Sequence, residues 1–75
     1  MKTKYKYIHF HKAGETLKTS IWSCYSNYDL HLGQVKWYAQ WRQYVFYPTA
    51  TTLYNKTCLD DISDFIKQLM EERKK

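Results

Sequence analysis

The chain has 75 residues and a net charge of +5 at pH 7, and 19% of its residues are aromatic. This length fits a single small domain over residues 1–75, whose modest core needs large side chains. No run of about 18 apolar residues is present, which excludes a membrane-spanning helix. The basic start lacks the apolar region of a signal peptide, and two cysteines cannot form the disulfide framework of a secreted protein, so we expect a cytoplasmic protein.

The positive charge is distributed unevenly along the chain. Residues 1–56 contain eight of the 12 basic residues and two of the seven acidic ones, which gives a net charge of +6, whereas residues 57–75 have a net charge of −1. A positive field concentrated in one part of a domain favours an anionic partner such as DNA or RNA.

The first half of the chain predicts two strands, each followed by a turn. Residues 5–11 suit an edge strand, because lysines at its start discourage pairing with another sheet, and Ile8 and Phe10 are its expected core pair. Gly14 with its polar neighbours predicts one turn, and a later run of Asn and Asp predicts another, since these residues tolerate left-handed conformations. The expected turn, strand and turn after the first strand span residues 12–18, 19–26 and 26–31.

The stretch LGQVKWYAQWRQYVFYP, residues 32–48, is dense in aromatic residues and predicts a central β-hairpin. Its strands are expected at residues 33–38 and 41–47, and Pro48 ends the second strand because proline cannot donate a ladder hydrogen bond. The expected loop is Ala39-Gln40, although this pair lacks the Gly or Asn that favours a two-residue turn.

Alternation of side chains divides this hairpin into two faces. A two-residue loop pairs Tyr38 with Trp41, and a four-residue loop over residues 38–41 keeps the same facing, whereas a three-residue loop would reverse one strand. The expected core face carries Val35, Trp37, Tyr44 and Phe46. The expected solvated face carries Gln34, Lys36, Tyr38, Trp41, Gln43, Val45 and Tyr47.

The pattern changes period near residue 57. Apolar residues then recur at spacings of three and four, which predicts one stripe along a C-terminal helix. Thr57, followed three residues later by Asp60, predicts an N-cap with an acidic capping-box residue, and the basic residues at 73–75 suit the other helix end. The stripe consists of Cys58, Leu59, Ile62, Phe65, Ile66, Leu69 and Met70.

These elements predict an α+β domain. Its antiparallel sheet has four strands, with residues 52–54 as a candidate fifth, and one C-terminal helix packs across one face. The other face is left to solvent, which is ordinary for antiparallel sheets.

Three segments resemble a family of short uncharacterised proteins from phages, prophages and other bacterial mobile elements: KTSIW (18–22), LGQVKWYAQWRQYVFYP (32–48) and CLDDISDFIKQLMEERKK (58–75). Members of that family carry a similar Lys-Trp-Tyr, Trp-Arg and Phe-aromatic-Pro core, followed by a C-terminal helix that contains Cys-Leu. The resemblance covers most of the chain. It implies a mobile-element setting, and it implies neither a mechanism nor functional residues.

The solvated sheet face combines cations and aromatic rings, which predicts binding of nucleic acid without catalysis. Cations neutralise phosphates, and flat rings stack on bases. Alternatively, the rings complete a small core, or the same face binds a host protein or a second copy of the chain. Arg42 could instead stack on Trp37, its expected cross-strand neighbour. The candidate binding residues are Tyr25, Lys36, Tyr38, Trp41, Arg42 and Gln43, and Tyr5, Tyr7 and His9 could extend the face.

Metal binding and catalysis find little support in the residue pattern. The side chains of His9, His11, His31, Cys24 and Cys58 are of ligand types, but no Cys-x-x-Cys or His-x-x-x-His spacing occurs. A helix N-terminus could lower the pKa of Cys58 and activate it, yet this residue begins the apolar stripe and is expected to be a buried thiol. We therefore expect no metal, no cofactor and no enzymatic activity.

Overall fold

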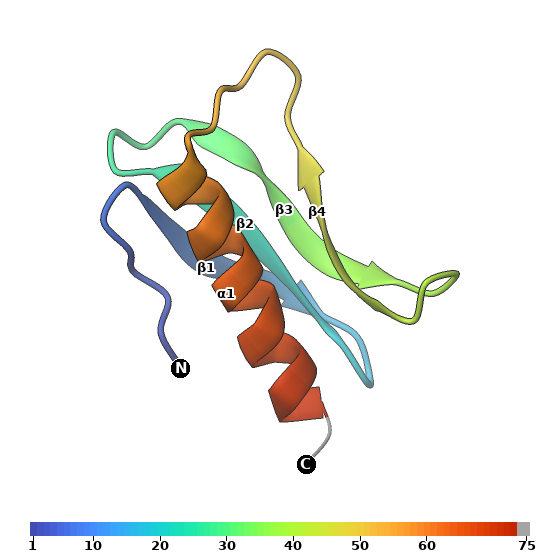
Figure 1. Cartoon of the computed structure of the whole chain (residues 1–75). Coiled ribbons are helices and arrows are strands. Elements are labelled where there is room, and N and C mark those ends of the chain that lie inside the picture. Colours follow the sequence, from blue (N-terminus) through green and yellow to red (C-terminus); the bar gives the residue numbers. More distant parts are fainter. Residues whose placement is uncertain (74–75) are drawn as a thin grey trace.

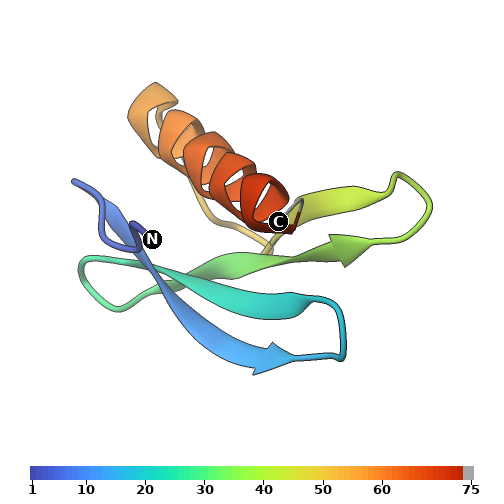
Figure 2. The ribbon, with the colours of Figure 1, turned by 90° about the horizontal axis from the view of Figure 1, so that it is seen from below.

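A computed structural model describes residues 1–73 of the chain. Four antiparallel strands form one sheet in the order β1-β2-β3-β4, and a helix, α1, follows them. The helix crosses one face of the sheet and leaves the other uncovered (Figures 1 and 2). The predicted α+β fold is therefore confirmed. The elements are β1 (Ile8–Glu15), β2 (Ser20–Ser26), β3 (His31–Tyr38), β4 (Gln43–Pro48) and α1 (Lys56–Arg73).

The segment before β1 folds back along the outer edge of that strand (Figure 1). Phe10 N donates to Thr3 O at 2.8 Å, and an isolated antiparallel bridge joins Lys4 to His9. Strand β1 therefore begins three residues later than the sequence predicts. Because the returning segment covers part of the β1 edge, the backbone groups of that edge are shielded from other chains.

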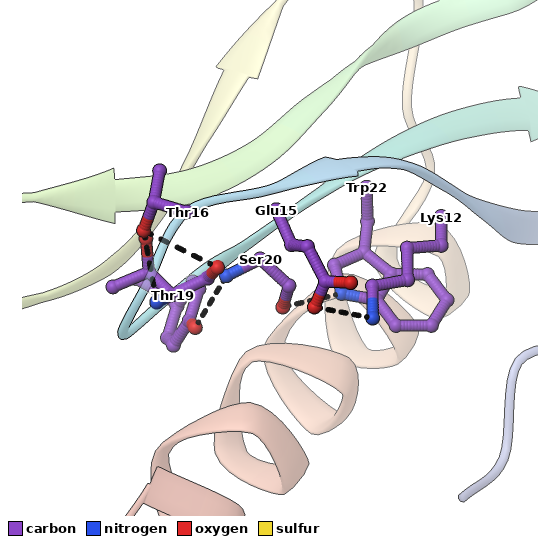
Figure 3. A network of polar contacts seen from close by, with 7 residues as sticks. Lys12, Glu15, Thr16, Thr19, Ser20 and Trp22 are labelled. Atoms are coloured by element: carbon purple, nitrogen blue, oxygen red, sulfur yellow. Dashed lines mark hydrogen bonds and ion pairs between the residues drawn. The ribbon is translucent and has the colours of Figure 1, made fainter.

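Strand β1 also continues four residues beyond its predicted end. Its pairing with β2 shifts between Lys12 and Gly14, and the turn falls at residues 16–19 instead of 12–18. Hydroxyl groups close this turn, because Thr16 Oγ1 accepts from Thr19 N at 3.0 Å (Figure 3). In the same network Trp22 Nε1 donates to Ser20 Oγ at 2.9 Å.

The central hairpin has the predicted faces with a different loop. Tyr38 pairs with Gln43 and Trp37 with Tyr44, so the loop comprises residues 39–42 and the predicted pairing was wrong by two residues. A shift by two residues preserves the alternation, so the division of the side chains into two faces is unchanged. Arg42 adopts a positive φ of 55°, which lets the chain close without a Gly or Asn.

The core lies between the sheet and α1 and centres on Phe65. This side chain is fully buried, stacks on Phe10 of β1 with ring centroids 4.0 Å apart, and meets Trp22 of β2 edge-on at 5.2 Å. On the same face, further toward β4, Val35 is fully buried, and Trp37 meets Tyr44 edge-on at 5.4 Å. The helix buries Cys58, Ile62, Phe65 and Leu69 from the predicted stripe.

The helix starts earlier than the sequence predicts, and its N-cap is Asn55 rather than Thr57. Asn55 Oδ1 accepts a hydrogen bond from Cys58 N at 2.8 Å, which is the geometry of an N-cap side chain. Residues 52–54 form no strand; instead the Tyr54 hydroxyl donates to Leu32 O at 2.7 Å. Of the basic residues predicted at the helix end, Arg73 lies in α1, and residues 74 and 75 are outside the described part of the chain.

Candidate nucleic-acid interface

The uncovered side of the sheet, called the open face below, displays alternate residues of all four strands. Pairing of β1 with β2 and of β3 with β4 aligns these side chains in rows across the sheet, because partners in an antiparallel pair point to the same side. The rows contain His9, His11, Ser23, Tyr25, Gln34, Lys36, Tyr38, Gln43, Val45 and Tyr47.

The β3–β4 half of the open face combines exposed rings with a cation. Trp41, on the loop between the strands, is 66% exposed and meets Tyr38 edge-on with ring centroids 5.0 Å apart. Lys36 Nζ lies 4.5 Å from the centroid of the Tyr47 ring, which is a cation–π contact. A shallow hollow of about 320 Å³ is lined by Tyr38, Trp41, Val45, Phe46 and Tyr47.

No carboxylate offsets the positive charge of this half. Residues 31–48 contain Lys36 and Arg42 and no acidic residue. Gln43 and Arg42 are exposed at the loop, and the Tyr38 hydroxyl donates to Gln40 Oε1. An anionic strand laid over this half would therefore meet cations and amide groups without a repelling charge.

The other half of the open face is a cluster of Tyr25 with three histidines. The Tyr25 ring lies 5.9 Å from both His9 and His11 and 5.3 Å from His31, and His9 and His11 are 4.9 Å apart. Asp29 of the β2–β3 turn borders this cluster. Its carboxylate makes this half less favourable for a phosphate than the β3–β4 half.

The structure brings together five of the six candidate binding residues on one face but separates them into two groups. Lys36, Tyr38, Trp41 and Gln43 gather in the β3–β4 half, whereas Tyr25 lies in the histidine cluster. The two groups lie toward opposite ends of strand β3, which has eight residues and is about 25 Å long.

Two predicted placements were wrong. Arg42 does not pair with Trp37, because it lies in the loop; instead Arg73 of α1 stacks on Trp37, with Cζ 4.0 Å from the ring centroid. Tyr5 does not extend the open face, since its hydroxyl donates to Asp64 Oδ2 of α1 at 2.8 Å. Burial, with that hydrogen bond second, raises the pKa of Tyr5.

The sequence reasoning left two contributors out of the candidate set. Tyr47 holds the Lys36 ammonium, and His11 joins the Tyr25 cluster. The alternation of β1 contained the signal for His11, because a core pair at Ile8 and Phe10 places residues 9 and 11 on the opposite side of the strand.

Both cysteines are buried free thiols in the core. Burial raises the pKa of Cys24 to about 12, and the neighbouring Cys58 thiol adds to this effect. Cys24 is therefore protonated at neutral pH and poorly suited to be a nucleophile. Among residues 1–73, no three His, Cys, Asp or Glu side chains are placed to share a metal ion.

Fold and surface together define a small α+β domain whose open sheet face carries aromatic side chains and Lys36. A stretch of 46 residues, 61% of the chain, is 41% identical to the "Uncharacterized 9.3 kDa protein" of Acholeplasma phage L2 and covers 59% of that protein. The chain thus spans less than two thirds of this relative, and the similarity supports the phage association that the family resemblance implied. No family model and no solved structure matches the chain. Within residues 1–73, no helix has the length and apolar character needed to cross a membrane.

Proposed function

We propose that the protein binds single-stranded nucleic acid, without catalysis, through the β3–β4 half of the open face. The observation that carries this proposal is the exposure of Trp41 beside Tyr38, on a hairpin that carries Lys36 and Arg42 and no carboxylate. Neighbouring exposed apolar side chains rimmed by polar residues are typical of interaction sites.

The two kinds of side chain contribute different parts of the binding energy. Trp41 and Tyr38 offer ring faces on which bases stack, and each stacked base contributes about 1–3 kcal/mol. Lys36 and Arg42 neutralise phosphates and release counterions, so affinity falls as salt rises. Unpaired bases suit this face because a duplex hides the base surfaces that the rings would contact. Either DNA or RNA meets these requirements.

Fluorescence anisotropy with labelled single-stranded oligonucleotides, at several salt concentrations, tests the proposal. We expect affinity that declines steeply with salt, weakened about fivefold or more by Trp41→Ala, since one lost stack is worth about 1–3 kcal/mol in such sites. Lys36→Ala should reduce the slope of log affinity against log salt by about one.

Lys67→Ala is the matched control for charge, because Lys67 is exposed on α1, on the covered side of the sheet. It removes the same charge as Lys36→Ala and should leave the salt dependence nearly unchanged. Absence of binding at low salt, or an equal loss from Lys67→Ala and Lys36→Ala, would contradict the proposal. In the second case the net charge of the domain, rather than the open face, would account for the affinity.

A further inference from the structure

An apolar groove lies at one end of the molecule, where the β2–β3 turn, the segment after β4 and the start of α1 meet (upper end of Figure 1). Its volume is about 610 Å³. This end groove is distinct from the open face, because its floor is formed by Ile8, Leu32 and Cys58 of the covered side. Its walls are formed mainly by Tyr7, Tyr28, Leu30, Leu53 and Tyr54.

The walls of the end groove expose large apolar side chains to water. Tyr28 is 96% exposed, Leu53 92% and Leu30 60%. With Tyr7, these side chains leave on the order of 400 Å² of apolar surface uncovered, since an aromatic side chain carries about 150–250 Å². One partner in a stable interface buries about 800 Å², of which roughly 56–65% is nonpolar. The apolar area that these four side chains expose at this end of the molecule is therefore close to what one half of a dimer interface supplies.

Polar atoms at the groove are already engaged within the chain. Ser26 Oγ accepts from Tyr28 N and Leu30 N, and Asn55 Oδ1 caps the helix. The Tyr54 hydroxyl donates to Leu32 O. A polar small molecule would find few free groups to orient it, whereas apolar side chains of a protein need only the surface that is present.

Charges around the groove are balanced, unlike those of the open face. Lys56 Nζ is paired with Asp60 Oδ2 at 2.7 Å on the first turns of α1, and the residues that line the groove are all uncharged. A surface with both signs can face its own copy across a two-fold axis without net repulsion. Two copies of the carboxylate-free β3–β4 surface would instead repel each other.

We infer that the end groove binds a second copy of the chain, forming a two-fold dimer in which the apolar walls of the two grooves cover each other. This dimer leaves both open faces accessible on the outside. The inference does not depend on nucleic-acid binding, because it uses none of the open-face residues.

Sedimentation velocity over a wide concentration range, on protein freed of nucleic acid at high salt, tests the inference. We expect a monomer–dimer equilibrium that persists at high salt, because the contacts are apolar. Leu53→Asp and Tyr28→Ser should each shift the protein to monomer while circular dichroism stays unchanged, since both side chains are almost fully exposed in the monomer. Leu17→Asp is the matched control: Leu17 is 98% exposed on the turn between β1 and β2, outside the groove.

Three results would overturn the inference: a monomer at every concentration, growth beyond a dimer, or a dimer that withstands Leu53→Asp and Tyr28→Ser and is lost with Trp41→Ala. The last result would place self-association on the open face. Anisotropy measurements on the Leu53→Asp variant separate this question from the proposed function. Unchanged affinity for an oligonucleotide would show that the two surfaces act independently, whichever oligomeric state is found.

Discussion

The two faces of this sheet use aromatic residues in opposite ways, although they share the same strands. On the covered face the rings of Phe10 and Trp22 pack against Phe65 of the helix, which buries Phe10 and part of Trp22. On the open face Trp41 and Tyr38 contact mainly each other, and Trp41 stays largely exposed. Residues that stabilise the core and residues proposed to bind a partner are thus neighbours whose side chains point to opposite sides of the sheet. Substitutions on the covered face should therefore change stability, and substitutions on the open face should change binding.

The largest effect should come from the covered face. Phe65→Ala removes the ring that joins Phe10 and Trp22 and leaves a cavity, so we expect a loss of about 3–5 kcal/mol in the free energy of unfolding. Urea unfolding followed by circular dichroism measures this loss, and Phe65→Leu serves as the milder control. A loss below about 1 kcal/mol would mean that the helix packs less tightly on the sheet than the ring contacts indicate.

Substitution of Gly33 tests how closely β3 and β4 pack at this position. A Cβ added at this buried position would clash with Tyr47 O and come within 2.7 Å of Phe46 Cζ. Because a backbone oxygen cannot move aside cheaply, Gly33→Ala should cost about 1–3 kcal/mol. Gly14→Ala is the matched control, since a Cβ there meets no atom within 4 Å. Equal losses from the two substitutions would argue against the close contact.

The division into faces was predictable from the sequence, whereas the register was not. Alternation along the hairpin placed Val35, Trp37, Tyr44 and Phe46 on the covered side, and all four lie there. The same alternation is blind to a shift of two residues, so it could not locate the loop at residues 39–42. That location depends on the positive φ of Arg42, for which its residue type gives little local signal.

The elements at the chain ends depend on contacts between distant residues, which no local pattern records. Tyr5 looked like part of a strand, but its hydroxyl is held by Asp64, 59 residues away, and by Gln68. Arg73 stacks on Trp37 across the core boundary. Such pairs depend on the position and direction of the helix on the sheet. The sequence predicts the helix and the face that it covers, but not this position.

Alkaline pH should lower the free energy of unfolding, because it favours ionisation of a thiol that is buried on the covered side. The pKa of Cys24 is raised from 9.0 to about 12 by burial, so the folded protein keeps the thiol neutral where the unfolded chain ionises it. The contribution of this thiol is therefore fully present below about pH 9 and is lost between there and about pH 12. Each such group can lower stability by at most about 1.4 kcal/mol per pH unit in this window.

Urea titrations at a series of pH values between neutral and about pH 11 measure the decline, and Cys24→Ala should make it shallower. Tyr5 and Tyr54 have raised pKa values, both chiefly through burial, and contribute in the same direction. An unchanged pH dependence in Cys24→Ala would indicate that the thiol is accessible to water in the folded protein.

The helix N-terminus offers a smaller and more local test. Asn55→Ala removes the side-chain acceptor for Cys58 N and should cost about 1 kcal/mol. Thr57→Ala, at the position that the sequence suggested as the cap, should change stability by only a few tenths of a kcal/mol. Thermal unfolding of both variants decides between the two caps, and a larger loss from Thr57→Ala would restore the cap that the sequence suggested.

Substitutions on the open face should have the smallest effect on stability. The two faces therefore differ in how much free energy of unfolding is lost when an aromatic ring is removed. Trp41→Ala removes a ring that is 66% exposed and packs edge-on against Tyr38, so we expect a change within about 0.5 kcal/mol. Trp22→Ala, which removes the same side chain from its contact with Phe65, should cost about 3 kcal/mol or more. Paired urea curves for the two variants measure the difference directly. Similar losses would make Trp41 a structural residue, and the loss of oligonucleotide affinity in Trp41→Ala could then no longer be assigned to base stacking.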